Sequence, residues 1–129
     1  MKALDTPVLL EILHDSPKAK ELLKGLRGEE LACTELNVYE LEVIASEGPK
    51  GRRSGRDDSI ARLRRRVTVL PVTGDAVREA ARVVRSRAGT VGYAPLMWGA
   101  LAAAGCRELI TTRPFAPPKD GLPFRVRIV

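Results

Sequence analysis

The sequence has few aromatic residues, and its cysteines and histidines are too sparse to build a zinc or haem site. Aromatic side chains make up 4% of the 129 residues, so leucine, valine, isoleucine and alanine must form the core, which favours an α/β fold over a β-sandwich. The single histidine, His14, and the two cysteines, Cys33 and Cys106, show no spacing typical of metal ligands. We therefore expect both cysteines to pack in the core, with a disulfide only if their strands are adjacent.

Long apolar runs are also missing. No stretch approaches the ~18 to 20 residues that cross a bilayer, and the N-terminus lacks the basic and apolar segments of a secretory signal. A length of 129 residues fits one domain with a single sizeable core. The sequence therefore predicts one soluble, cytoplasmic domain over residues 1–129, with no membrane contact.

Positive charge is concentrated in one segment. Residues 49–66 contain eight basic and two acidic side chains, which account for the whole net charge of +6. Because lysine and arginine release counterions from nucleic acid, this segment predicts a surface that binds phosphate backbones. A solvated loop and helix that only aid solubility, or a site for an acidic protein, are the alternatives. The arginines assigned to the phosphate-binding surface are Arg52, Arg53, Arg56, Arg62, Arg64, Arg65 and Arg66.

Strand and helix signals alternate along the chain. Strands are expected at 1–5, 29–34, 67–72, 108–112 and 124–129. Helices are expected from Pro7 to about Leu13, with Thr6 as the N-cap, and at 18–26, 36–46, 75–88 and 94–104. A loop of Gly, Pro and Arg leads to a short helix around Ile60 and Leu63. This order predicts a three-layer α/β/α domain with a central, mainly parallel five-stranded sheet, whose last strand lies at an edge.

Two carboxylates are predicted to meet at the carboxyl end of this sheet. Asp5 ends the first strand, before a helix that Thr6 and Pro7 open, and Glu40 lies in the helix after the second strand. Oxygen ligands of this kind suit Mg²⁺, which usually takes one or two carboxylates and completes its shell with water and substrate phosphates. The alternative is structural, because an aspartate in this position often caps a helix and a helical glutamate is often only solvated.

Three segments occur in a fixed order along the chain: KALDTPVLLEIL, TELNVYELEVIA and GYAPLMWGALAAAGCRELITTRPF. Together they resemble the PIN domain family, particularly VapC-type toxins, over essentially the whole chain. The resemblance implies a PIN-like fold and an endoribonuclease that cuts RNA with Mg²⁺ or Mn²⁺, has an antitoxin partner and forms a homodimer. It also implies that Asp5 and Glu40 are catalytic metal ligands, that Thr6 and Thr111 support them, and that the arginine-rich segment faces RNA.

The sequence departs from the family pattern at the metal site. The third acid of the family falls on Ala94, and the fourth polar or acidic position falls on Arg113. Pro7 replaces the asparagine that usually follows the first Asp-Thr. No other nearby acid is an evident replacement, neither Glu35, nor Glu42, nor Asp75. We therefore expect a VapC-like protein with impaired nuclease activity, and the alternative is a non-catalytic PIN-like module that binds RNA or a protein.

Arg113 reverses the charge expected at its position. We hypothesise that its guanidinium occupies or screens the space that a metal ion fills in active relatives. Thr111 and Thr112 lie at a strand end, where their hydroxyls either touch phosphate and water or only cap a turn. The remaining candidates for a base-stacking surface are more simply explained as core or subunit contacts: Tyr93, Met97 and Trp98.

Overall fold

A parallel five-stranded sheet forms the centre of the domain. The computed structural model describes residues 1–47, 50–86, 91–113 and 122–129, and of residues 50–57 only the backbone. The strands, in spatial order β3-β2-β1-β4-β5, are all paired in parallel. Their bounds are β1 Lys2–Leu4, β2 Leu31–Thr34, β3 Thr68–Leu70, β4 Glu108–Thr111 and β5 Arg125–Ile128. The sheet and its edge strand β5 agree with the sequence prediction.

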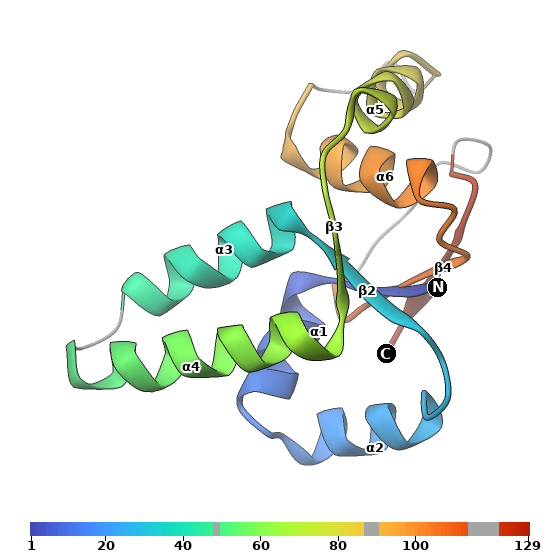
Figure 1. The fold of residues 1–129 in the computed structure, drawn as a ribbon. Helices are drawn as coiled ribbons and strands as arrows, with labels where there is room; N and C mark the ends of the chain where they lie inside the picture. The colour runs from blue at the N-terminus through green and yellow to red at the C-terminus, as the bar shows by residue number, and fades with distance from the viewer. Residues whose placement is uncertain (48–49, 87–90, 114–121) are drawn as a thin grey trace.

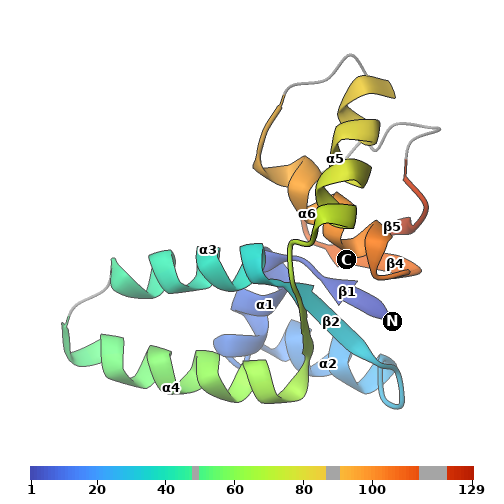
Figure 2. The same ribbon diagram turned by 45° about the horizontal axis from the view of Figure 1, so that its top comes forward.

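Helices cover both faces of the sheet, so the domain has three layers (Figures 1 and 2). The first hydrophobic cluster joins the sheet to α1 (Thr6–Leu13), α2 (Pro17–Gly25), α3 (Glu35–Ser46) and α4 (Lys50–Arg66). The second cluster joins it to α5 (Gly74–Ser86) and α6 (Tyr93–Ala103). Because successive residues of a strand point to opposite faces, Ala3 packs in the second cluster and Leu4 in the first.

The start of α1 differs from the sequence prediction in a way that shapes the site. Asp5, not Thr6, is the N-cap, and its Oδ1 accepts a hydrogen bond of 2.8 Å from the Thr6 backbone N–H. Thr6 is the first helical residue, so its hydroxyl is available for other partners. The Asp5 N–H also donates to the Ile110 carbonyl at 2.9 Å, which fixes the cap against β4.

The basic segment forms one helix, and the prediction of a loop before a short helix was wrong. α4 runs from Lys50 to Arg66. Ile60 and Leu63 anchor it in the first hydrophobic cluster. Because arginine is a good helix former and helices propagate more easily than they nucleate, the anchored turn extends towards the N-terminus. Figures 1 and 2 show α4 beside α3, and Arg64 pairs with Glu35 across the two helices at 3.1 Å.

The two cysteines are buried and free, on opposite sides of the sheet. Cys33 belongs to the first hydrophobic cluster and Cys106 to the second. This placement excludes the disulfide that the sequence left open. Burial raises the pKa of the Cys33 thiol to about 12, so it stays protonated and unreactive at neutral pH. A search of the described helices found none with the length and apolarity to span a membrane.

Candidate functional site

Five residues from α1, α3, β4 and the positions beside them meet at the carboxyl ends of β1 and β4. We call this set the acid cluster: Asp5, Thr6, Glu40, Thr111 and Arg113. Asp5 is only 6% exposed, and its Oδ2 accepts a hydrogen bond of 2.8 Å from Thr111 Oγ1. Thr6 bonds to both carboxylates: its Oγ1 donates to Glu40 Oε1 at 3.2 Å, and its backbone N–H donates to Asp5 Oδ1. The two predicted carboxylates therefore lie on either side of Thr6.

Arg113 closes the acid cluster into a ring. Its backbone N–H donates to Thr111 Oγ1 at 3.1 Å, and its guanidinium Nη2 lies 3.7 Å from Glu40 Oε2. The second distance is too long for a hydrogen bond, so this ion pair is loose. With two carboxylates and one guanidinium, the cluster carries a net charge of about −1. The structure thus places Arg113 beside a predicted metal ligand.

Asn37, which the sequence analysis did not single out, supports the acid cluster through a hydrogen bond to Thr6. Its Oδ1 accepts hydrogen bonds from the backbone N–H and hydroxyl of Thr34, at 2.9 and 2.7 Å, which completes a capping box at the start of α3. Its Nδ2 donates to Thr6 Oγ1 at 3.0 Å. The Thr6 hydroxyl therefore has a donor on one side and Glu40 as acceptor on the other. The Thr-x-x-Asn spacing after a strand was the signal that could have identified Asn37.

Tyr93 also lies at the acid cluster, although the sequence favoured a core or subunit contact for it. Its hydroxyl donates a hydrogen bond to the Leu36 carbonyl of α3. Burial, followed by the negative charge of Glu40, raises the pKa of Tyr93 to about 12, so the phenol stays protonated and remains a donor at neutral pH. Met97 and Trp98, by contrast, are buried in the second hydrophobic cluster, as core residues.

The other predicted site residues lie outside the acid cluster. Ala94, at the expected third acid position, is exposed in the first turn of α6, and Thr112 is partly buried after β4. Arg62 and Arg66 line a cavity of about 300 Å³ between α1 and α4, while Arg64 faces α3 and Arg65 is exposed. The side chains of Arg52, Arg53 and Arg56 fall outside the described residues.

The carboxylate oxygens of the acid cluster suit a divalent cation that takes few ligands from the protein. Asp5 and Glu40 supply carboxylate oxygens, each with a lone pair left beyond the contacts described above. Mg²⁺ commonly binds with one or two carboxylates and several waters. Within the described ranges, however, no group of three or more acidic, histidine or cysteine side chains comes together. A cation here would have two carboxylates and would compete with Arg113 for Glu40.

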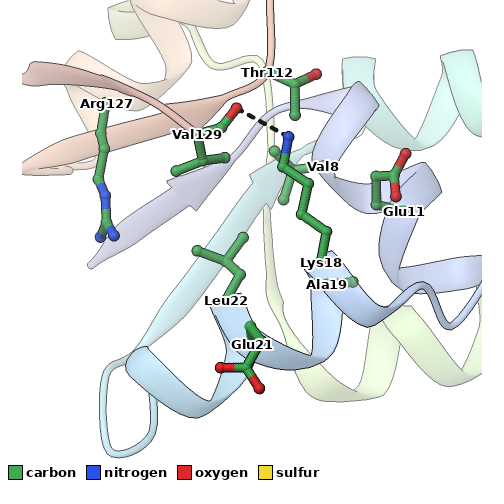
Figure 3. Close-up of a pocket in the computed structure, with 9 residues that line it drawn as sticks. All are labelled: Val8, Glu11, Lys18, Ala19, Glu21, Leu22, Thr112, Arg127 and Val129. Carbon is green, nitrogen blue, oxygen red and sulfur yellow. Dashed lines mark hydrogen bonds between the residues drawn. The ribbon is translucent and has the colours of Figure 1, made fainter.

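A separate pocket of about 270 Å³ opens between α1, α2 and the end of β5 (Figure 3). Val8 and Leu22 provide apolar lining, and Glu11, Lys18 and Glu21 provide charge. Lys18 Nζ donates to the Val129 carbonyl at 3.1 Å across one side of the pocket. Thr112, next to Thr111 in the chain, also lines it, so the pocket and the acid cluster share the segment that follows β4.

Replacing Asn37 with alanine is expected to lower the free energy of unfolding by about 1–3 kcal/mol, because buried partners in Thr34 and Thr6 would lose hydrogen bonds. Urea denaturation followed by circular dichroism measures this change. Ser46→Ala is the control, since Ser46 is exposed at the other end of α3 and bonds to the Val43 carbonyl of its own helix. Equal stability of the two variants would contradict the role given to Asn37.

Comparison with known proteins agrees with this architecture. The family model of the PIN domain matches residues 2–113. Among solved structures, FitAcB from Neisseria gonorrhoeae has a TM-score of 0.79 at 14% identity over 98% of this chain and 96% of that one. DNA-bound VapBC from Salmonella typhimurium has a TM-score of 0.77 at 16% identity over 98% and 96%. VapBC-5, a toxin-antitoxin system of Mycobacterium tuberculosis, has a TM-score of 0.71 at 21% identity over 99% and 98%. A search of the curated proteins found no significant match.

Proposed function

Because this chain belongs to the PIN domain family, we propose that it is a VapC-like protein of a toxin–antitoxin pair, with a reduced metal site for cutting RNA. The observation that carries this proposal is the junction of Asp5 and Glu40 through Thr6. The first segment of the chain and the helix after β2 supply one carboxylate each, which is the arrangement that the family resemblance implies for metal ligands.

Asp5 and Glu40 would hold Mg²⁺ or Mn²⁺. When bound, the cation would polarise a phosphodiester and lower the pKa of a water molecule. The chain itself contributes orientation: Thr111 fixes one oxygen of Asp5, and Asn37 orients the Thr6 hydroxyl towards Glu40. These bonds keep both carboxylates in place before a cation binds, which lowers the cost of assembling the site.

We expect α4 to supply long-range attraction for RNA. Arg62, Arg65 and Arg66 are exposed, so phosphates in solution can reach them. They lie on the helix beside α3, the element that carries Glu40 (Figure 1). Their expected effect is sequence-independent affinity that falls as salt concentration rises.

An antitoxin is the protein partner that we propose, since two of the similar structures are a member of a toxin–antitoxin family and a toxin–antitoxin complex. The pocket near Thr112 is suited to one of its side chains, because it combines apolar walls with charges of both signs. A partner bound there would contact Thr112, which lies between Thr111 and Arg113 of the acid cluster in the chain. The homodimer implied by the family resemblance stays a prediction.

A second candidate function is a non-catalytic RNA-binding module. The observation that favours it is the guanidinium of Arg113, which lies 3.7 Å from Glu40 and carries positive charge where the family pattern has a polar or acidic residue. In that case the fold and the basic helix would bind RNA without a cation.

Metal binding distinguishes the two candidates. Isothermal titration of the metal-stripped protein with Mn²⁺ is expected to show one site in the parent and none in Asp5→Ala. Because Asp5 also caps α1, Glu40→Gln is the second variant, since it removes charge and leaves the cap intact. Glu42→Ala is the control, because Glu42 is an exposed acid of α3, the helix that carries Glu40, and this variant should bind Mn²⁺ like the parent. Absence of binding in the parent, or equal binding in all four proteins, would overturn the metal site.

A further inference from the structure

Two tyrosines meet at the rim of the acid cluster. Tyr39 lies in α3 directly before Glu40, and Tyr93 is the first residue of α6. Their ring centroids are 6.3 Å apart and the ring planes are tilted by 43°. The bond from the Tyr93 hydroxyl to the Leu36 carbonyl fixes that ring against α3. The pair is therefore an aromatic surface that joins two helices, with the Tyr93 ring held in place.

Much of this aromatic surface is open to solvent. Tyr39 is 61% exposed and Tyr93 is 37% exposed, while the other large aromatic residue of α6, Trp98, is buried. An exposed ring held in place loses little conformational freedom when a flat ligand stacks on it. Unpaired nucleobases are such ligands, and their stacking on aromatic side chains tolerates any sequence.

Arg113 supplies the charge that such a ligand needs. Its side chain is 56% exposed, while its backbone is fixed by the bond to Thr111. The guanidinium has five N–H donors, and its contact with Glu40, at 3.7 Å, leaves them available. Guanidinium groups bind phosphate through paired hydrogen bonds that are stronger than a loose ion pair. A phosphate would therefore compete well with Glu40 for Arg113.

The tyrosines and Arg113 are organised around the same residue. Glu40 follows Tyr39 in α3, its charge acts on the Tyr93 phenol, and it faces Arg113. We propose that Tyr39, Tyr93 and Arg113 form a nucleotide subsite for single-stranded RNA, in which a base stacks on Tyr39 and the adjoining phosphate binds Arg113. The inference rests on the proposed function for the kind of ligand, but it does not require a bound cation or cleavage.

The subsite also favours unpaired RNA over duplex. In an RNA duplex each base is stacked on its neighbours, so a base can reach Tyr39 only from a single-stranded segment. Binding of the phosphate to Arg113 would release Glu40 from its ion pair. The same event that places RNA at the site would then leave a carboxylate free for a cation.

Fluorescence anisotropy of a labelled ten-nucleotide single-stranded RNA of mixed sequence, in EDTA, tests the subsite without metal or catalysis. Tyr39→Ala is expected to weaken binding about tenfold, and Tyr39→Phe, which keeps the ring, should bind like the parent. Arg113→Gln should weaken binding and lower the slope of log affinity against log salt by about one. Arg107→Gln, an exposed arginine at the opposite end of β4, is the matched control.

The outcomes separate this subsite from the proposed function. If the parent binds RNA, and if Tyr39→Ala and Arg113→Gln each bind it as well as the parent does, the subsite is wrong while RNA binding stands. If the parent binds no RNA in this assay, both the subsite and the RNA-binding role fail. Sedimentation of Tyr39→Ala completes the test: a dimeric parent that becomes monomeric on this substitution would show that the ring belongs to an interface between copies of the chain.

Discussion

Replacing Arg113 with aspartate is expected to tighten Mn²⁺ binding by at least about tenfold, which corresponds to about 1.4 kcal/mol. The substitution removes a cation that lies 3.7 Å from Glu40 and adds an acid at the position where the family pattern has a polar or acidic residue. One pair of unit charges about 4 Å apart interacts by about 1 kcal/mol in water and by about 4 kcal/mol near a protein surface. The lower figure applies, because the Arg113 side chain is more than half exposed, and it counts for each of two changes, the loss of the cation and the gain of the acid, which together reach about 2 kcal/mol.

Titration calorimetry measures this change, with Arg125→Asp as the control. Arg125 is exposed at the amino end of β5, so its replacement alters the net charge equally but leaves the acid cluster untouched. An equal gain in both variants would mean that general electrostatics, and not the position of Arg113, limits metal affinity. If Arg113→Asp binds Mn²⁺ no better than the parent, the hypothesis that Arg113 screens the site is wrong.

Replacing Gly99 with alanine is expected to lower the free energy of unfolding by about 3 kcal/mol or more. Gly99 lies where α6 crosses α5, and a Cβ there would overlap the Ala76 carbonyl oxygen and lie 2.8 Å from the Ala80 nitrogen. Both obstacles are backbone atoms of α5, so no side chain can rotate away. The helices must separate, which opens the second hydrophobic cluster. Thermal unfolding followed by circular dichroism measures the loss.

The control for Gly99→Ala is Gly25→Ala. Gly25 is the last residue of α2, and a Cβ there meets nothing within 4 Å. Alanine has the higher helix propensity, so this variant should be as stable as the parent or more stable, by up to about 1 kcal/mol. If Gly99→Ala is as stable as Gly25→Ala, the close contact of α5 and α6 tolerates a Cβ and this prediction is wrong.

The sheet, and the placement of Asp5 and Glu40 on the same threonine, could be predicted because both depend on order along the chain. Alternating strands and helices produce a parallel sheet, and parallel strands place their carboxyl ends at one edge. Asp5 and Glu40 follow β1 and β2, which are neighbours in the sheet, so little else was needed. The extent of α4 was missed because its glycines and arginines have no apolar pattern, while its anchor, Ile60 and Leu63, lies near its far end.

Asn37 and Tyr93 were missed for a different reason: their roles arise from contacts between helices. Asn37 bonds to Thr6, 31 residues earlier in the chain, and Tyr93 bonds to the Leu36 carbonyl, 57 residues earlier. Local sequence identified the apolar surroundings of Tyr93 but not the place where the start of α6 meets α3. Such contacts depend on how two helices pack on the sheet, which no pattern within one segment specifies.

The position of β1 at the centre of the sheet also bears on how the protein is made. Asp5 is synthesised well before its partner Thr111, which comes 106 residues later in the chain. Contacts so distant in sequence form late, after the intervening strands and helices have been produced. An incomplete chain that ends before β4 therefore has Asp5 and Glu40 but lacks Thr111 and Arg113. A nascent chain on the ribosome therefore carries no assembled acid cluster until β4 and the residues after it have emerged.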